Sequence, residues 1–253
     1  MSFYDNSKEE RKRISEHIES LIFDDYQNGS YENIVMFSAD KDTYIRKIVY
    51  LATGKLYKNN EALREEILNT LDILFKDENE YIRQTVAYSL GEIGKIDAYK
   101  VSQLLEKSLD DVHHSVRNAV IGALKQMGNK NPKPTLEFAA KFYNHEDPEV
   151  RRQVIHGIEL RGRTHPEEVL PILFDARNET NRRVRDMLIH VLGQISYKSG
   201  CLEKVIEAIK DWENKDLIND IVKEILEVHK RYEKFSDKSF NEAKEYIENI
   251  IHL

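Results

Sequence analysis

The sequence is poor in the residues that interrupt helices, and it lacks the patterns of β-strands. Its 253 residues include only 10 glycines and 5 prolines. Alternating runs of Val, Thr and aromatic residues bounded by Asn-Gly or Asp-Gly are missing, which argues against strands. Charged residues make up 33 % of the chain, and Leu, Ile, Glu and Lys recur throughout. This composition favours an all-α protein.

Long hydrophobic segments are also missing. The longest apolar runs span a few residues, as in 169–174, whereas a membrane helix needs about 20. We therefore expect no membrane span. Residues 1–13 are polar and lack the apolar segment of a secretory signal, and the single cysteine, Cys201, cannot form an internal disulfide. Together these features predict a cytoplasmic protein.

The chain is acidic overall, but its arginines are concentrated in one place. The formal net charge is −7, which argues against indiscriminate binding to nucleic acid. Residues 151–193 nevertheless carry a net charge of +2, against −6 for residues 1–150. Eight of the fifteen arginines lie between Asp147 and Ile195. They are Arg151, Arg152, Arg161, Arg163, Arg177, Arg182, Arg183 and Arg185.

A repeat organises the chain. A β-branched apolar residue followed by arginine recurs at intervals of 37, 34, 34 and 34 residues, and Asn219 stands at the next step of 34 as a degenerate sixth copy. The repeated arginines are Arg46, Arg83, Arg117, Arg151 and Arg185. Four residues before four of them stands a residue typical of a helix N-cap. These are Asp42, Asn79, Asp147 and Asn181, whereas His113 departs from the pattern.

A second amphipathic segment precedes each arginine helix, so each unit is predicted to be a helical hairpin. We expect these segments at 62–75, 99–109, 134–143, 167–176 and 202–212. One hairpin cannot bury its apolar face alone, so adjacent hairpins must stack. Residues 1–253 are therefore predicted to form a single right-handed α-solenoid of about six hairpins over residues 30–232. Helices at 7–23, which begins with the capping box Ser7-x-x-Glu10, and at 236–252 would close its ends.

The period of 34 residues and the motif Asp147-Pro-Glu-Val-Arg-Arg resemble HEAT repeats of the short kind, over about residues 30–232. In such proteins the arginine after the apolar residue often pairs with an acid of a neighbouring repeat. That role accounts for Arg46, Arg83 and Arg117, and Arg151 and Arg185 fit it as well. The other arginines of 147–195 are additional to the repeat.

These additional residues are predicted to form a basic strip. In a helix, Arg152, His156, Glu159 and Arg163 would share one face, and His190 would occupy the neighbouring helix. We expect an anion-binding site, with DNA or an acidic protein segment as its partner, because guanidinium groups match phosphates and carboxylates. The candidate residues are Arg151, Arg152, His156, Arg161, Arg163, Arg182, Arg183, Arg185 and His190. The alternative is a network of ion pairs with acids of the same region, namely Glu159, Asp175, Glu179 and Asp186.

A narrower resemblance covers about fifty residues. The run Val150–Arg163, then Val169-Leu170-Pro171 and Val184-Arg185, looks like the central repeats of the HEAT-like alkylpurine DNA glycosylases. This resemblance implies a concave basic face that holds duplex DNA by its backbone. One branch of that family carries a carboxylate and an indole where this sequence has His156 and Thr164. The resemblance therefore favours DNA binding without catalysis.

No other chemistry is indicated. The nine histidines include no His-x-x-x-His pair, and no phosphate-binding or dinucleotide-binding loop occurs, so we expect no metal and no cofactor. The sequence thus predicts a non-enzymatic binding protein that engages an anionic partner, DNA above others. A scaffold for protein–protein interaction is the first alternative. Excision of alkylated bases, with Glu159 as the substitute acid, is the second.

Overall fold

The computed structural model describes residues 3–251, and every regular element in that range is a helix. Residue 252, the end of the predicted C-terminal helix, lies outside this range. The chain divides into two compact units, Met1–Asn131 and Pro132–Leu253, and each is described by itself. None of the helices within residues 3–251 is both long enough and apolar enough to cross a membrane.

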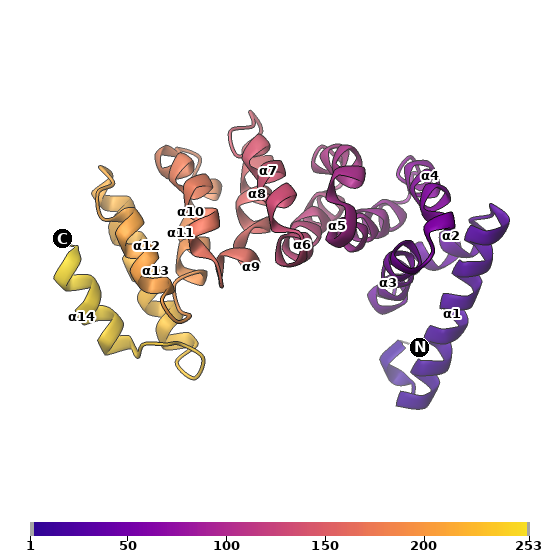
Figure 1. Cartoon of the computed structure of the whole chain (residues 1–253), viewed down its shortest axis with the longest axis horizontal. Coiled ribbons are helices and arrows are strands. Elements are labelled where there is room, and N and C mark those ends of the chain that lie inside the picture. Colours follow the sequence, from indigo (N-terminus) through magenta and orange to yellow (C-terminus); the bar gives the residue numbers. More distant parts are fainter. Residues whose placement is uncertain (1–2, 252–253) are drawn as a thin grey trace. The chain divides into compact units, whose positions relative to one another are not determined.

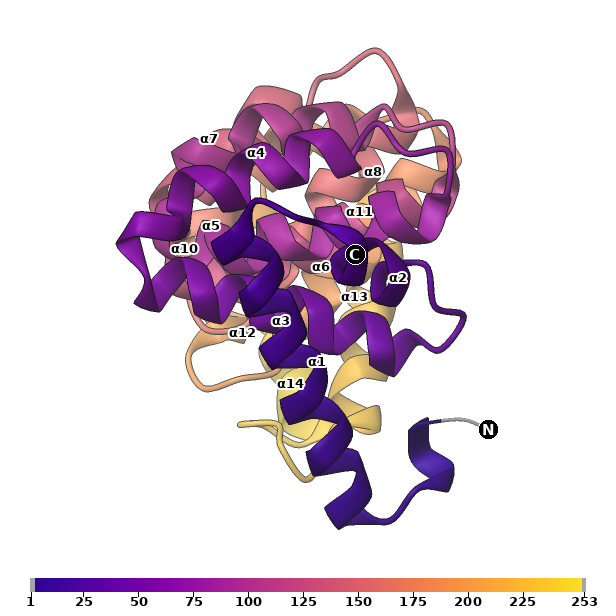
Figure 2. The ribbon, with the colours of Figure 1, turned by 90° about the vertical axis from the view of Figure 1, so that its right-hand side faces the viewer.

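The first unit begins with the short helix η1 (Phe3–Asp5). The elements that follow are α1 (Lys8–Asn28), α2 (Glu32–Ser38), α3 (Thr43–Asn59), η2 (Glu61–Leu63), α4 (Arg64–Leu74), α5 (Glu80–Leu109) and α6 (His114–Lys130). Helix α3 packs against α1 and α5, and α5 packs against α6. Figure 2 shows α1 lying along α3. The predicted N-terminal helix therefore forms and extends five residues beyond its expected end at residue 23.

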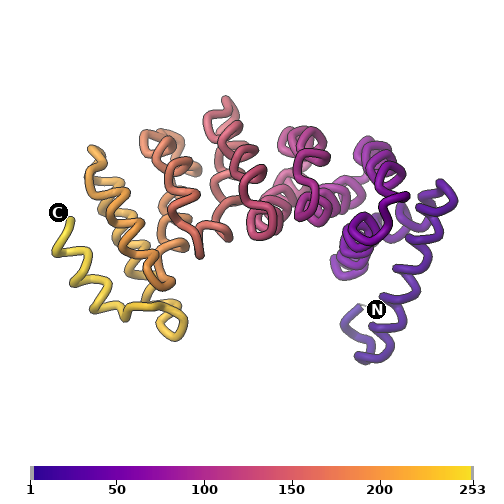
Figure 3. Tube along the Cα trace, in the orientation of Figure 1, coloured from indigo at the N-terminus to yellow at the C-terminus, as the bar shows by residue number. Residues whose placement is uncertain are grey.

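The second unit contains α7 (Pro132–Phe142) and the hairpins after it. Its further elements are α8 (Pro148–Gly157), α9 (Glu159–Gly162), α10 (Pro166–Asp175), η3 (Ala176–Asn178), α11 (Arg182–Gln194), α12 (Cys201–Ile209), α13 (Lys215–Arg231) and α14 (Phe240–Ile250). Helix α11 packs between α8 and α13, and α10 packs against α12 (Figure 1). Helix α14 covers α12 and α13 at the C-terminal end (Figure 3).

The helix boundaries follow the capping signals of the sequence. The side chains of Asp42, Asn79, Asp147 and Asn181 each accept a backbone N–H from the residue two positions later. At the exception, His113, the ring Nδ1 lies 3.4 Å from Ser115 N and fills the same role. The capping box at Ser7 is present, and a second one at Ser239 starts α14 later than predicted.

Helix α5 consists of the two helices that the sequence predicts, the arginine helix of one repeat and the first helix of the next, and they meet at a kink. The kink lies at Asp97, whose φ of −138° and ψ of 74° are outside the helical region. Both predicted helices are therefore present.

The core of each unit is the apolar stripe of its stacked helices. Three residues after the repeat arginine, Val120, Val154 and Leu188 are completely buried. Burying one such side chain contributes about 1.5–3 kcal/mol. Because each arginine helix buries this stripe against its neighbours, the hairpins depend on one another for stability.

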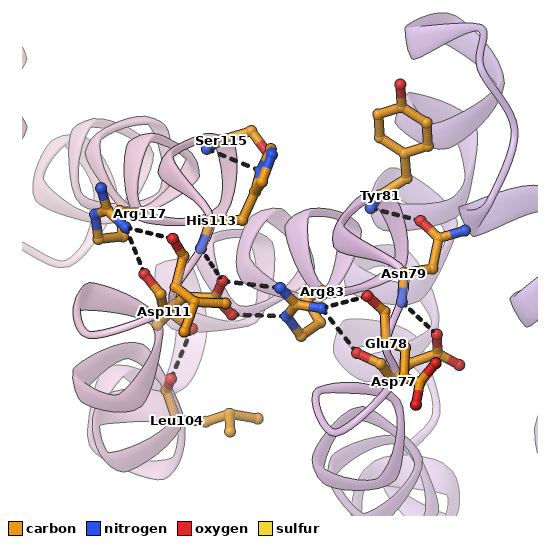
Figure 4. A network of polar contacts seen from close by, with 12 residues as sticks. Asp77, Glu78, Asn79, Tyr81, Arg83, Leu104, Asp111, His113, Ser115 and Arg117 are labelled. Carbon is orange, nitrogen blue, oxygen red and sulfur yellow. Dashed lines mark hydrogen bonds and ion pairs between the residues drawn. The ribbon is translucent and has the colours of Figure 1, made fainter.

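Two of the repeat arginines, Arg83 and Arg151, connect successive repeats through the same arrangement, which Figure 4 shows for Arg83. Arg83 Nη1 donates to the carbonyl oxygens of Asp77 and Glu78, 2.8 and 2.9 Å away. Its Nε and Nη2 donate to the two carboxylate oxygens of Asp111, at 2.7 and 3.0 Å. Asp111 Oδ1 also accepts the backbone N–H of His113, at the start of α6. We call this arrangement the arginine clamp.

The second unit contains the same clamp. Arg151 donates to the carbonyl oxygens of His145 and Glu146 and to both carboxylate oxygens of Glu179. In both clamps the acid follows the arginine by 28 residues. The prediction that repeat arginines pair with acids of a neighbouring repeat is therefore confirmed for Arg83 and Arg151.

The clamp lowers the pKa of its acids. Burial raises the pKa of Asp111, but the hydrogen bonds from Arg83 and from the backbone of His113 outweigh burial and hold this pKa below its usual value. Burial and the hydrogen bonds from Arg151 and Asn181 act in the same way on the pKa of Glu179. Each clamp is therefore strongest when its carboxylate is ionised.

We expect the Asp111→Asn variant to lose about 3 kcal/mol of stability at pH 7, because Arg83 is left buried without its counter-charge. The folded-state pKa of Asp111 is depressed, so its contribution is fully present above the unfolded-state pKa of about 3.9 and is lost as the pH falls through the folded-state value. The difference between wild type and variant should therefore shrink below about pH 4. Urea unfolding at several pH values measures it. The exposed neighbour variant, Asp110→Asn, is the control, and equal pH profiles for Asp111→Asn and wild type would contradict the clamp.

We expect Gly91→Ala to destabilise the first unit by about 1–3 kcal/mol, because α5 and α6 approach too closely for a side chain. A Cβ at position 91 would lie 2.6 Å from Ala123 Cα. At Gly122 the added Cβ would meet the ring of Tyr88 at 2.8 Å, and a side chain can move aside. Gly122→Ala is thus the matched control. Urea unfolding midpoints should fall more for Gly91→Ala, and equal midpoints would show that the helices can separate without cost.

Candidate functional site

An interruption of the fourth arginine helix positions the centre of the site. Asp147 caps α8 and Pro148 stands in its first turn, as the sequence predicts. Helix α8 ends at Gly157, and the short helix α9 begins at Glu159 after the buried residue Ile158. The side chain of Glu159 is only 3 % exposed.

Cationic and titratable groups surround the buried Glu159 carboxylate. Arg163 Nη2 donates to Glu159 Oε1 at 2.5 Å and to Gln194 Oε1 at 2.8 Å. His156 Nε2 lies 3.2 Å from Glu159 Oε2, and His190 Nε2 lies 3.8 Å from the same oxygen. The predicted proximity of His156, Glu159 and Arg163 is therefore confirmed, and His190 joins them from α11.

The remaining arginines of α8 and α9 are engaged by other acids. Arg152 donates to Glu149 at 2.6 Å, and its side chain is 13 % exposed. Arg161 Nη2 lies 2.5 Å from an oxygen of Glu168. The hydrogen bonds from Arg161 hold the pKa of Glu168 below its usual value. Both arginines thus lie in ion pairs within the second unit.

Arg185 also belongs to an ion pair between repeats. Its Nη2 donates to Asp220 Oδ2 of α13 at 2.7 Å. Together with the Arg151 clamp, this contact gives a structural role to both repeat arginines of the region. Neither role requires a ligand.

Arg182 and Arg183 are the exposed members of the predicted set. Their side chains are 93 % and 74 % exposed. Arg182 lies 3.7 Å from Asp186 and Arg183 lies 3.3 Å from Glu149, and exposed ion pairs of this kind contribute little to stability. Both residues stand in the first turn of α11, where the backbone N–H groups make the helix end electropositive.

The nine predicted site residues thus form three groups. One group surrounds Glu159, one lies in ion pairs elsewhere, and the pair Arg182 and Arg183 is exposed. Of the acids weighed as partners, Glu159, Glu179 and Asp186 make such contacts. The sequence interpretation did not single out the other acids that take part. They are Glu149, Glu168, Asp220 and Glu224.

The 34-residue period indicates the partners of two of these acids. Glu224 follows His190 by 34 residues, as His190 follows His156, and His190 Nδ1 lies 3.8 Å from Glu224 Oε1. Glu149 precedes its partner Arg183 by the same interval. Equivalent positions of stacked repeats lie side by side, so a shift of 34 positions, forward from His190 and backward from Arg183, would have found both.

Two other residues of the second unit have packing roles. Trp212 is 4 % exposed, and its ring centroid lies 6.3 Å from that of Phe174. Cys201 starts α12 but is buried, and burial raises the pKa of its thiol. The thiol form of Cys201 is therefore favoured over the thiolate.

Comparison with known proteins agrees with this architecture. The family of HEAT repeats matches residues 67–141 and 135–226, and no curated protein sequence matches. The solved structure of AlkD2 from Streptococcus mutans is similar, with a TM-score of 0.55 and 17 % identity, and covers 87 % of this chain and 100 % of its own. The structure of smu.31 from Streptococcus mutans UA159 has a TM-score of 0.53 and 18 % identity, with the same coverage.

These two structures agree with the predicted all-α solenoid at the level of the fold. Their identity to this chain is too low to carry any function across. The family match is broader, because it extends over more than half of the sequence and includes both units. The chain therefore belongs to the HEAT-repeat family.

Proposed function

We propose that this protein is a HEAT-repeat binding protein that engages DNA through the basic surface at the start of α11. The observation that carries the proposal is the exposure of Arg182 and Arg183, at 93 % and 74 %, beside acids that bind them only weakly. Guanidinium groups in this state bind phosphate oxygens without first breaking a buried ion pair.

Arg152 provides a second contact in this proposal. Its partner Glu149 also lies 3.3 Å from Arg183, so one carboxylate is shared by two guanidinium groups. Arg182 stands beside this group, in the first turn of the same helix as Arg183. A phosphate near the N-terminus of α11 would meet the exposed guanidinium groups of Arg182 and Arg183 and the helix dipole.

DNA is favoured over other anions by the sequence resemblance. The run Val150–Arg163 resembles the repeats with which alkylpurine DNA glycosylases hold a duplex. We propose binding rather than base excision, because the substitute acid Glu159 is buried and hydrogen-bonded to Arg163. A catalytic carboxylate must reach the reacting sugar, and this one is enclosed.

We expect the double variant Arg182→Ala/Arg183→Ala to bind duplex DNA about tenfold more weakly or worse at low salt. Each lost hydrogen bond to a charged phosphate contributes about 1.5 kcal/mol or more. The slope of log K against log salt should also fall by about 2. Fluorescence anisotropy with a labelled duplex measures both quantities.

A matched control is Lys230→Ala/Arg231→Ala, an exposed basic pair at the end of α13 in the same unit. Circular dichroism should show both double variants folded. If the Arg182 and Arg183 variant binds DNA as the control does, the proposal fails. Release of free base from alkylated DNA by the wild-type protein would establish excision instead of simple binding.

Binding of a protein segment is a second candidate, and a cleft of the first unit favours it. This cleft of about 260 Å³ is lined by Tyr44, Lys47, Tyr50 and Tyr88 among others. The ring centroids of Tyr50 and Tyr88 lie 5.1 Å apart. Tyrosine side chains are enriched at protein interfaces, and in this cleft Tyr44 is exposed while Tyr50 and Tyr88 are half-buried.

The exposed Lys47 offers a test of this second candidate. Charge reversal by Lys47→Glu should abolish the capture of an acidic protein partner from cell extract while DNA binding is unchanged. The exposed control Lys130→Glu on α6 should keep the partner. A set of captured proteins that is the same for wild type and Lys47→Glu would rule out this cleft as the interface.

A further inference from the structure

We propose that His156, Glu159 and His190 bind a divalent transition-metal ion, zinc above others. The three residues come from three helices of the second unit, α8, α9 and α11. They offer one ligand atom each, and these three atoms all lie within 4.8 Å of one another. This inference does not depend on the proposed binding of DNA.

The distances suit a tetrahedral ion. Donor atoms about 2.0–2.1 Å from a tetrahedral zinc ion are separated by about 3.4 Å. The carboxylate oxygen Glu159 Oε2 lies 3.2 Å from His156 Nε2 and 3.8 Å from His190 Nε2. The ring centroids of the two histidines are 5.9 Å apart, and their planes are inclined by 86°. Small side-chain rotations would bring all three donors to a common centre.

The donor set is that of a zinc site with an open position. Two imidazole nitrogens and one carboxylate leave the fourth tetrahedral position for water or a ligand. The side chains of His156 and His190 are 25 % and 39 % exposed, so solvent reaches this position. Glu159 is 3 % exposed, and the ion would supply a positive charge to this buried carboxylate.

Residues around the three donors hold them in the required orientation. Arg163 Nη2 binds Glu159 Oε1, which directs the other oxygen, Oε2, toward the histidines. His190 Nδ1 lies 3.8 Å from Glu224 Oε1, beyond hydrogen-bond distance, and a small rotation of either side chain would let this carboxylate accept the Nδ1–H when Nε2 binds a metal. In His156 the nitrogen that faces the other donors is Nε2. Its Nδ1 is buried and has no hydrogen-bond partner among residues 3–251.

The charges near the site do not prevent cation binding. Glu159 compensates the positive charge of Arg163, although the guanidinium group still repels a cation. Glu224 adds a negative charge beside His190. An ion bound by two histidines and Glu159 would therefore have carboxylates both as a ligand and in the second layer, which offsets the repulsion from Arg163.

The repeat explains how such a site arises without a local motif. His156 and His190 are 34 residues apart, one period of the array, and Glu224 is one period further. A bound ion would connect α8 and α11, which belong to successive repeats and already pack together. Metal binding would therefore stabilise the folded state of the second unit.

The test uses the untagged full-length chain, freed of metal with a chelator and titrated with zinc chloride by isothermal calorimetry. We expect one zinc ion per chain and a rise in the thermal unfolding midpoint at saturating zinc. His190→Ala should weaken binding about tenfold or more, as should Glu159→Gln. The matched control is His165→Ala, which removes a histidine of the same unit that lies outside the site.

Cobalt provides a readout that needs no variant. Wild-type protein loaded with Co²⁺ should show the visible absorption of a four-coordinate site with nitrogen and oxygen ligands. Zinc should displace this absorption. If wild-type, His190→Ala and His165→Ala proteins bind zinc equally, or if Co²⁺ gives only the spectrum of the hydrated ion, the inference is wrong. A sulfur-to-cobalt band would assign the ion to Cys201 and would also overturn it.

Discussion

The arginine clamp is the interaction on which the stacking of repeats depends. Hydrophobic burial between helices has no preferred register by itself, whereas a guanidinium that binds two carbonyl oxygens and both oxygens of a carboxylate fixes several directions at once. Arg83 and Arg151 make these bonds with acids 28 residues later, and the same acids accept the backbone N–H of the residue that caps the next helix, His113 or Asn181. One side chain therefore sets both the position of the following repeat and the start of its second helix.

The clamp also explains why an acidic protein contains a region dense in arginine without a correspondingly positive surface. Arg151 and Arg185 connect repeats, while Arg152 and Arg161 lie against carboxylates in the second unit. Such ion pairs fix geometry more than they contribute net stability. In this region the positive charge that a partner can reach lies chiefly on Arg182 and Arg183. The proposed function rests on the exposure of these two side chains.

Much of the fold could be predicted because its determinants are local and periodic. The N-caps Asp42 and Asn181 and the 34-residue spacing are visible in the sequence, and the structure contains the helices they indicate. The pairing of charges was harder to predict, since a run of arginines specifies which groups are present but not which acid each one meets. The break between α8 and α9 at Ile158 had no clear signal either, and neither had the burial of Glu159, the residue after it.

The period itself carries part of the missing information. In a stacked array, a residue lies beside the residues one period before and after it. The series at positions 122, 156, 190 and 224 reads Gly, His, His and Glu, so three polar residues follow a glycine at one structural position. A solenoid can therefore gather titratable groups by substitution at a single repeat position, without a specialised loop or a short motif. Sequence searches that look for ligands three or four residues apart pass over such a group, because its members meet only when the repeats stack.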